Sequence, residues 1–324
     1  MASLTPPLAT IGILSVGDMG VGIARLLTAN NYRVVTNASD RSEATQNRAR
    51  QNNVELLPND IELCNAADYI LSIVPPSDAY STAQRISNAT TDPAFQPRKT
   101  PLYFLDLNAI SPSSSRHIAQ IFTTQDSPAL FIDGSIIGNP PKQNADDTTW
   151  TLPSIPTSGP HALSAAPQNG AHLAKILNTT HITPTISSAS GLKMCFSALS
   201  KGFTALAIAS LTTAHNLNCI PELQQHLETF NPGAAKAINS VTRMPPKAYR
   251  WVYEMQEIAR TFEEEGGFVE GESMFRAIAG VYELVAEGTE LGKERTGERA
   301  RGESVEDVAV LMSEGARRRK EKTE

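Results

Sequence analysis

The chain has 324 residues, of which 40% are hydrophobic and 19% charged, and its net charge at pH 7 is −6. This balance is typical of a globular protein with room for two domains, and it excludes a disordered chain. The acidic charge argues against a general nucleic-acid-binding protein. Because no run of about 18 apolar residues and no secretory signal are apparent, the sequence predicts a cytoplasmic protein without a membrane span.

The first half of the chain alternates between short apolar runs and stretches with helical spacing. The spacing predicts helices over residues 19–31 and 41–53. This alternation predicts an α/β fold with a doubly wound parallel sheet of the Rossmann type. The expected strands are 9–16, 32–38, 69–75, 102–108, 129–138, 149–159 and 181–187.

The character of the sequence changes near residue 189, where one long apolar helix is followed by amphipathic helical stretches. We therefore expect two domains, a Rossmann domain over 1–188 and an all-helical domain over 189–324. Residues 287–304 are charged and punctuated by glycine, which predicts a mobile connection. The basic tail, 315–324, is interpreted as a solvated helix end.

The stretch ILSVGDMGVG joins the first expected strand to the first helix, with the spacing of a dinucleotide-binding turn. Gly17 would allow close approach of the backbone to a pyrophosphate, and Gly20 would allow close packing of helix on strand. Ser15 replaces the first glycine of the usual motif, which is acceptable if its backbone angles are ordinary. The turn, including Asp18 and Met19, predicts a nucleotide site; the alternative is a glycine-rich turn without function.

The end of the second expected strand bears on the choice of nucleotide. NAD sites usually place an acidic residue there to hold the ribose hydroxyls, whereas this chain has Asn37. Asp40 would favour NAD if it faced the ribose, and Asp40 or Ser39 could instead cap the next helix. The residues able to surround a 2′-phosphate are Arg41, Ser42 and Thr45, and they favour NADP over NAD.

Five stretches follow one another in a recognisable order: IGILSVGDMG, SIVPPSDA, LDLNAISP, IDGSIIGNPP and SGLKMCFSALSKG. Together they resemble the β-hydroxyacid dehydrogenase and 6-phosphogluconate dehydrogenase superfamily over residues 10–260. They are most similar to a branch with an uncharacterised C-terminal domain, found in bacterial and fungal oxidoreductases. The resemblance implies a Rossmann domain, a helical domain and a homodimer formed through the helical domain.

The resemblance also implies where cofactor and substrate bind. The second stretch would line the nicotinamide ribose, and the third ends at a strand terminus where open α/β sheets place ligands. The fourth occupies the place of the family's substrate-binding segment. The residues concerned are Val74, Pro75, Pro76 and Asn108 for the cofactor, and Ser135 and Gly138 for the substrate.

Lys193 stands where the family carries its catalytic lysine, so the resemblance implies a general acid or base on the substrate oxygen. A lysine in an apolar cleft can have a pKa low enough for this role; the alternative is a surface lysine. Ser197 replaces an asparagine that helps to hold the substrate. Lys201, two turns along the helix, would bind a substrate carboxylate or remain a surface charge.

These features predict an NADP-dependent oxidoreductase acting on a small hydroxy or oxo compound, most similar to a β-hydroxyacid. An imine reductase on the same fold is an alternative, although Lys193 favours carbonyl or alcohol chemistry. A non-catalytic NADP-binding protein is a further alternative, suggested by the departures at Ser15 and Ser197. Wide cysteine and histidine spacing predicts no metal site.

Overall fold

The computed structural model describes residues 6–124, 127–145, 149–269 and 274–322. It divides into two compact units, Met1–Lys193 and Met194–Glu324. We expected the boundary between residues 188 and 189, before the long helix. The division into compact units falls five residues further along, inside that helix, and the expected catalytic lysine belongs to the first unit.

The first unit is built on an eight-stranded sheet with the order β10-β9-β6-β5-β4-β1-β2-β3. The six strands from β3 to β6 are parallel, which confirms the expected Rossmann-type sheet. The strands are β1 (Thr10–Leu14), β2 (Arg33–Asn37), β3 (Glu55–Leu57), β4 (Tyr69–Ser72), β5 (Leu102–Asp106), β6 (Ala129–Gly134), β9 (Ile155–Ser158) and β10 (Thr179–Thr183). The edge strand β3 was not expected, because its three residues are too short to show a pattern.

The last two strands correct the prediction of a wholly parallel sheet. β9 pairs antiparallel with β6, and β10 is parallel to β9. Between β6 and β9 the chain forms the small hairpin β7 (Lys142–Gln143) and β8 (Trp150–Thr151) rather than a crossover helix. A parallel connection needs a crossover, so the returning chain enters the sheet in the opposite direction.

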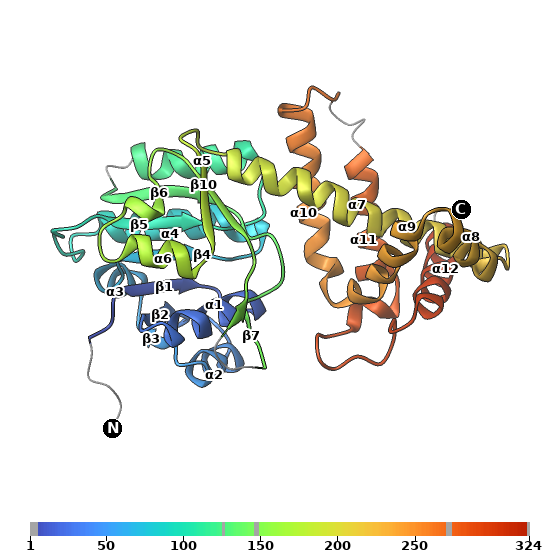
Figure 1. Cartoon of the computed structure of the whole chain (residues 1–324), viewed down its shortest axis with the longest axis horizontal. Coiled ribbons are helices and arrows are strands. Elements are labelled where there is room, and N and C mark those ends of the chain that lie inside the picture. Colours follow the sequence, from blue (N-terminus) through green and yellow to red (C-terminus); the bar gives the residue numbers. More distant parts are fainter. Residues whose placement is uncertain (1–5, 125–126, 146–148, 270–273, 323–324) are drawn as a thin grey trace. The chain divides into compact units, whose positions relative to one another are not determined.

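Helices cover both faces of this sheet (Figure 1). On one face α1 and α6 bury Ile23, Leu27 and Leu173 in one apolar cluster, and on the other α3, α4 and α5 contribute to a second cluster. The helices are α1 (Asp18–Ala29), α2 (Glu43–Gln51), α3 (Asp60–Ala66), α4 (Ala79–Thr91), α5 (Pro112–Thr124) and α6 (Gly170–Ile176), with 3-10 turns at Pro76–Asp78 and Leu163–Ala165.

The described part of the second unit is helical and contains no strand, as expected. Its helices are the C-terminal part of α7 (Ser188–Asn216), α8 (Ile220–Phe230), α9 (Pro232–Ala237), α10 (Ala248–Glu264), α11 (Met274–Gly288) and α12 (Val305–Glu321). Shorter 3-10 helices span Ile238–Arg243, Pro245–Lys247 and Glu290–Lys293. In the basic tail, Arg317 to Lys320 are exposed on α12, as expected of a solvated helix end, whereas Gly315 is buried and residues 323–324 lie outside the described residues.

α7 is long and apolar enough to cross a membrane on length and composition alone, with a mean hydropathy of 1.4. This finding differs from the expectation that no segment meets that criterion. Half of the apolar window is buried. Lys193 and Lys201 interrupt the apolar sequence of this continuous helix.

The glycine-punctuated segment at 287–304 is not the loose connection that its composition predicts. Leu291 is fully buried, and Arg299 donates hydrogen bonds to the backbone oxygens of Thr242 and Gly302. Arg301 pairs with Asp307 at the start of α12. Charge and glycine content therefore predicted mobility where side-chain hydrogen bonds to backbone carbonyls hold the segment in place.

Candidate functional site

The turn between β1 and α1 adopts a strained backbone. Ser15 has a φ of +85°, in the region that favours glycine, so the expectation of ordinary backbone angles is wrong. A Cβ on Gly20 would collide with the carbonyl oxygen of Ser15. The helix can therefore approach the turn only with glycine at position 20, and Ser15 accepts the unfavourable angle that a glycine would adopt freely.

Gly17 forms the N-cap of α1 and leaves the surface of the turn open. Its side-chain position faces only the Ser15 hydroxyl, at 3.8 Å, and no side chain caps the helix. The first backbone amides of a helix have no partner within it, and they favour an anion. An added Cβ would fill this open space, which therefore suits a pyrophosphate that approaches the backbone closely.

A cavity of about 260 Å³ connects this turn with the end of β2, the loop after β4 and the start of α4. The predicted cofactor residues that line it are Ser15, Gly17, Asn37, Arg41, Thr45, Val74 and Pro75. Other predicted residues, Asp18, Met19, Gly20, Ser42, Pro76 and Asn108, are not among its lining residues. The structure thus brings residues from four separate segments to one cavity.

Two arginines line this cavity that the sequence did not identify, Arg48 and Arg85. Arg48 lies one helical turn after Thr45 on α2. Arg85 shares a face of α4 with Thr82, and Asp78 is the N-cap of that helix; both also line the cavity. The spacing of three and four residues was the available signal. It carries no information without the knowledge that this face meets the end of β2.

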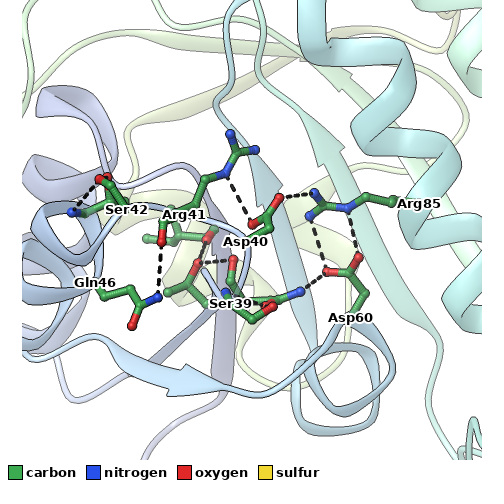
Figure 2. A network of polar contacts seen from close by, with 11 residues as sticks. Ser39, Asp40, Arg41, Ser42, Gln46, Asp60 and Arg85 are labelled. Carbon is green, nitrogen blue, oxygen red and sulfur yellow. Dashed lines mark hydrogen bonds and ion pairs between the residues drawn. The ribbon is translucent and has the colours of Figure 1, made fainter.

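The residues after β2 form a polar network (Figure 2). Ser42 caps α2 by accepting a hydrogen bond from the Thr45 amide at 3.4 Å, so neither Ser39 nor Asp40 caps the helix. Asn37 accepts from the Ser39 amide and donates to Asp60 at 2.8 Å. No acidic side chain stands at position 37 itself.

Asn108 supports the cavity wall through its neighbours. Its buried side chain accepts a hydrogen bond from the Val74 amide at 2.7 Å and donates to the Ser72 hydroxyl at 3.0 Å. It therefore fixes the loop that carries Val74 and Pro75. Its predicted contact with the cofactor stays a prediction.

Asp106, at the end of β5, is a buried carboxyl group whose pKa is raised. The pKa of Asp106 is raised to about 7, mainly by burial; hydrogen bonding from Asn108 opposes the shift, and the nearby Asp133 charge adds to it. Only Oδ1 has a hydrogen-bond partner among the described residues, the Asn108 amide. The neutral acid is thus the form that this site favours below neutral pH.

Asp133 on β6 lies opposite Asp106 on β5, but both of its carboxylate oxygens have hydrogen-bond partners. Its two oxygens accept hydrogen bonds from the hydroxyls of Ser115, Ser158 and Ser190, at 2.8, 2.5 and 2.5 Å. The backbone amides of Ala189 and Ser190 also donate to it, at 3.1 and 3.3 Å. Asp133 therefore anchors the first turn of α7, where a carboxylate is favoured by the helix dipole.

Lys193 lies one turn beyond this anchor. Its Nζ donates a hydrogen bond to the carbonyl oxygen of Ile136 at 2.9 Å, within the segment predicted to bind substrate. Ser135 in the same segment is fully buried, and its hydroxyl has no partner among the described residues. Gly138 has a φ of +127° and is exposed. The structure thus places Lys193 beside the predicted substrate segment.

The other two predicted substrate residues lie in the second unit. Lys201 forms an ion pair with Glu254 and lies 4.9 Å from the centre of the Trp251 ring. Ser197 is buried, and its hydroxyl has no partner in the described part of the chain. Lys201 is therefore neither a free surface charge nor an isolated cation, and substrate binding by both residues stays a prediction.

Two family descriptions match the chain. Residues 10–94 match "NADP oxidoreductase coenzyme F420-dependent", and residues 214–285 match "Domain of unknown function (DUF1932)". We find no match among curated protein sequences. The first match covers the turn, β2 and the start of α4, which together line the cavity.

Solved structures share the fold over nearly the whole chain. A 3-hydroxyisobutyrate dehydrogenase from Salmonella typhimurium is 14% identical with a TM-score of 0.61, covering 94% of this chain and 99% of that one. A conserved hypothetical protein from Sinorhizobium meliloti is 21% identical with a TM-score of 0.59, covering 95% and 97%. An imine reductase from Myxococcus stipitatus, in complex with NADP+, is 17% identical with a TM-score of 0.53, covering 93% and 98%. The chain is therefore similar to the NADP oxidoreductase family over residues 10–94 and to the DUF1932 family over residues 214–285, and it shares the fold of the 3-hydroxyisobutyrate dehydrogenases.

Proposed function

We propose that the protein is an NADP(H)-dependent oxidoreductase acting on a small hydroxy or oxo compound of the β-hydroxyacid type. The lining of the cavity supports the choice of NADP(H), because three arginines, Arg41, Arg48 and Arg85, could bind the additional phosphate. Asn37 also replaces the acidic residue that NAD sites usually have at the end of β2. The family match over residues 10–94 and the fold of the related dehydrogenases support the same class.

Each part of the cofactor has suitable residues in the first unit. Gly17 and the N-terminus of α1 would hold the pyrophosphate. Arg41 and Thr45 would hold the 2′-phosphate, and the loop with Val74 and Pro75 would lie beside the ribose. The bound nicotinamide supplies a hydride donor or acceptor at its C4 atom.

The observation that carries the proposed chemistry is the hydrogen bond from Lys193 Nζ to the Ile136 carbonyl oxygen. Oxidation of an alcohol releases a proton from its oxygen, and neutral Lys193 can accept that proton at Nζ. In the reducing direction the Lys193 ammonium donates the proton to the carbonyl oxygen. Asp133 supports this role indirectly, because it fixes the helix turn from which Lys193 extends.

The test is the variant Lys193→Met, assayed with NADPH and NADP+ against a panel of small β-oxo and β-hydroxy acids. We expect turnover to fall about a thousandfold, a typical loss for a general acid or base, while the NADPH dissociation constant changes less than twofold. Lys175→Met, which removes an exposed lysine of α6, is the matched control. If Lys193→Met retains wild-type turnover, the catalytic assignment is wrong.

The same panel decides between the alternatives when cyclic imines are added. Turnover of imines alone would assign the chain to imine reduction, for which the Myxococcus stipitatus enzyme provides the fold precedent. NADPH binding without turnover of any compound would favour a non-catalytic nucleotide-binding protein. We also propose a homodimer formed through the helical unit, for which sedimentation equilibrium should give twice the chain mass.

A further inference from the structure

A second guanidinium approaches the predicted phosphate position from α4. Arg41 and Arg85 both line the nucleotide cavity, and the Asp40 carboxylate lies between them (Figure 2). Asp40 Oδ1 is 3.4 Å from Arg41 Nε, and its Oδ2 is 3.6 Å from Arg85 Nη1. Two cations that reach one carboxylate can also reach one phosphate, since both groups present oxygens to a guanidinium in the same way.

Asp60 holds Arg85 in this orientation. Arg85 Nε and Nη2 contact the two oxygens of Asp60 at 2.8 and 3.3 Å, a bidentate pair that leaves Nη1 directed at Asp40. Asp60 is the less exposed partner, at 17% against 37% for Arg85, and it also accepts from the Asn37 amide. The residue at the end of β2 and the arginine on α4 are thus oriented by one carboxylate.

We propose that Arg85 is a specificity-determining residue for NADP(H), forming with Arg41 a two-sided clamp on the 2′-phosphate. The phosphate displaces the Asp40 carboxylate from between the two arginines. A 2′-phosphate carries more negative charge and more acceptor oxygens than a carboxylate, so it is the stronger ligand for two guanidinium groups. NAD(H) lacks this phosphate and leaves Asp40 in place. The inference rests on the proposed function and names the residues that set its nucleotide preference.

The clamp should depend on salt and charge more than on packing. Asp40, Arg41 and Arg85 are partly exposed, so each contact is screened and individually weak. Removal of the Asp40 charge should therefore strengthen phosphate binding modestly. Removal of Arg85 should weaken it more, because the oriented side of the clamp is lost.

The test compares 2′,5′-ADP with 5′-AMP, two fragments that differ by the 2′-phosphate, using calorimetry on the full chain. We expect Arg85→Gln to weaken 2′,5′-ADP binding at least tenfold and 5′-AMP binding less than twofold. Arg50→Gln is the matched control, since it removes the same charge from exposed Arg50, which contacts Gln46 and Asn47 and does not line the cavity. Asp40→Asn should tighten 2′,5′-ADP binding about threefold to fivefold and leave 5′-AMP unchanged.

Several results would overturn the clamp. Equal weakening of both fragments by Arg85→Gln would show that Arg85 only supports the cavity through Asp60 and Asn37. An unchanged 2′,5′-ADP affinity would show that Arg85 does not reach the phosphate. If thermal unfolding shows that Arg85→Gln is destabilised, Arg85→Lys replaces it and should give an intermediate loss for 2′,5′-ADP alone. Failure of wild-type protein to bind NADPH, in contrast, would refute the proposed function itself.

Discussion

The first unit contains two polar assemblies built in different ways. The nucleotide turn, from Leu14 to Gly20, is contiguous in the sequence and opens onto a cavity. The Asp133 cluster draws its members from α5, β6, β9 and α7, and it is buried. The turn presents backbone groups to an open cavity where a ligand could bind. In the cluster, hydrogen-bond donors of the protein itself surround a buried carboxylate. A surface that is open to a ligand thus leaves hydrogen-bonding groups available, whereas a buried structural support pairs them within the protein.

The supporting cluster should give the largest effect when it is broken. Asp133→Asn replaces an acceptor oxygen with a donor amide among three hydroxyls and two backbone amides. We expect the free energy of unfolding to fall by about 4 kcal/mol, because buried donors lose a charged acceptor. Urea denaturation at pH 7 measures this loss, and a change below 1 kcal/mol would contradict the anchoring role.

In the nucleotide turn, the effect should depend on which glycine is changed. Gly20→Ala places a Cβ against the Ser15 carbonyl oxygen, so the turn must shift, at a cost of about 3 kcal/mol in stability. Gly17→Ala meets only the Ser15 hydroxyl at 3.8 Å and should fold normally while NADPH affinity falls at least tenfold. Thermal unfolding and calorimetry separate the two outcomes. Equal stability losses in both variants would refute the distinction.

The neighbouring buried carboxyl group, Asp106, should make the stability of the fold depend on pH. Burial raises the pKa of Asp106 from 3.8 to about 7, so between these values the native state binds more protons than the unfolded chain. The free energy of unfolding therefore falls as pH rises through this range.

Asp106→Asn removes this titration. Wild type should lose about 2 kcal/mol of stability from pH 5 to pH 7 through this group, at about 1.4 kcal/mol per pKa unit, and the variant should not. The stability of the variant minus that of wild type should therefore rise by about 2 kcal/mol over this range. Urea denaturation of both proteins at the two pH values measures the difference. A parallel pH dependence in the two proteins would show that Asp106 titrates normally.

The smallest effect concerns the strain at Ser15. Ser15→Gly should raise the free energy of unfolding by about 1 kcal/mol, because glycine adopts a positive φ without penalty. Ser187→Gly is the comparison, since Ser187 has a similar φ of +83° but its hydroxyl accepts a hydrogen bond from Arg116. Its gain should be offset by the lost bond. A loss of stability in Ser15→Gly would mean that the serine side chain supports the turn.

Local features of this fold were predictable because each lies within a short window of sequence. The alternation of apolar runs predicted the parallel sheet from β1 to β6, and the turn after β1 predicted a nucleotide site at a place where the structure contains a cavity. The same patterns could not give the direction of β9 and β10, because an apolar strand has the same periodicity in either orientation.

Side-chain partners that lie far apart along the chain were beyond these patterns. Asp133 lies 57 residues before Ser190, and Arg85 lies 25 residues after Asp60, so nothing in the local spacing links them. Ser15 shows the same limit at close range, since its identity suggested tolerance whereas its φ depends on how α1 packs.

The sequence by itself determined the class of the fold, the position of the nucleotide turn and the uncharged end of β2. These depend on residue type and short-range periodicity, which act before the chain is folded. Only the tertiary structure decided that Asp133 holds the start of α7, that Lys193 reaches the Ile136 carbonyl, and that Arg85 faces Arg41 across Asp40. The physical reason is that burial and charge pairing arise where the ends of different strands meet, and strand order is a property of the whole sheet.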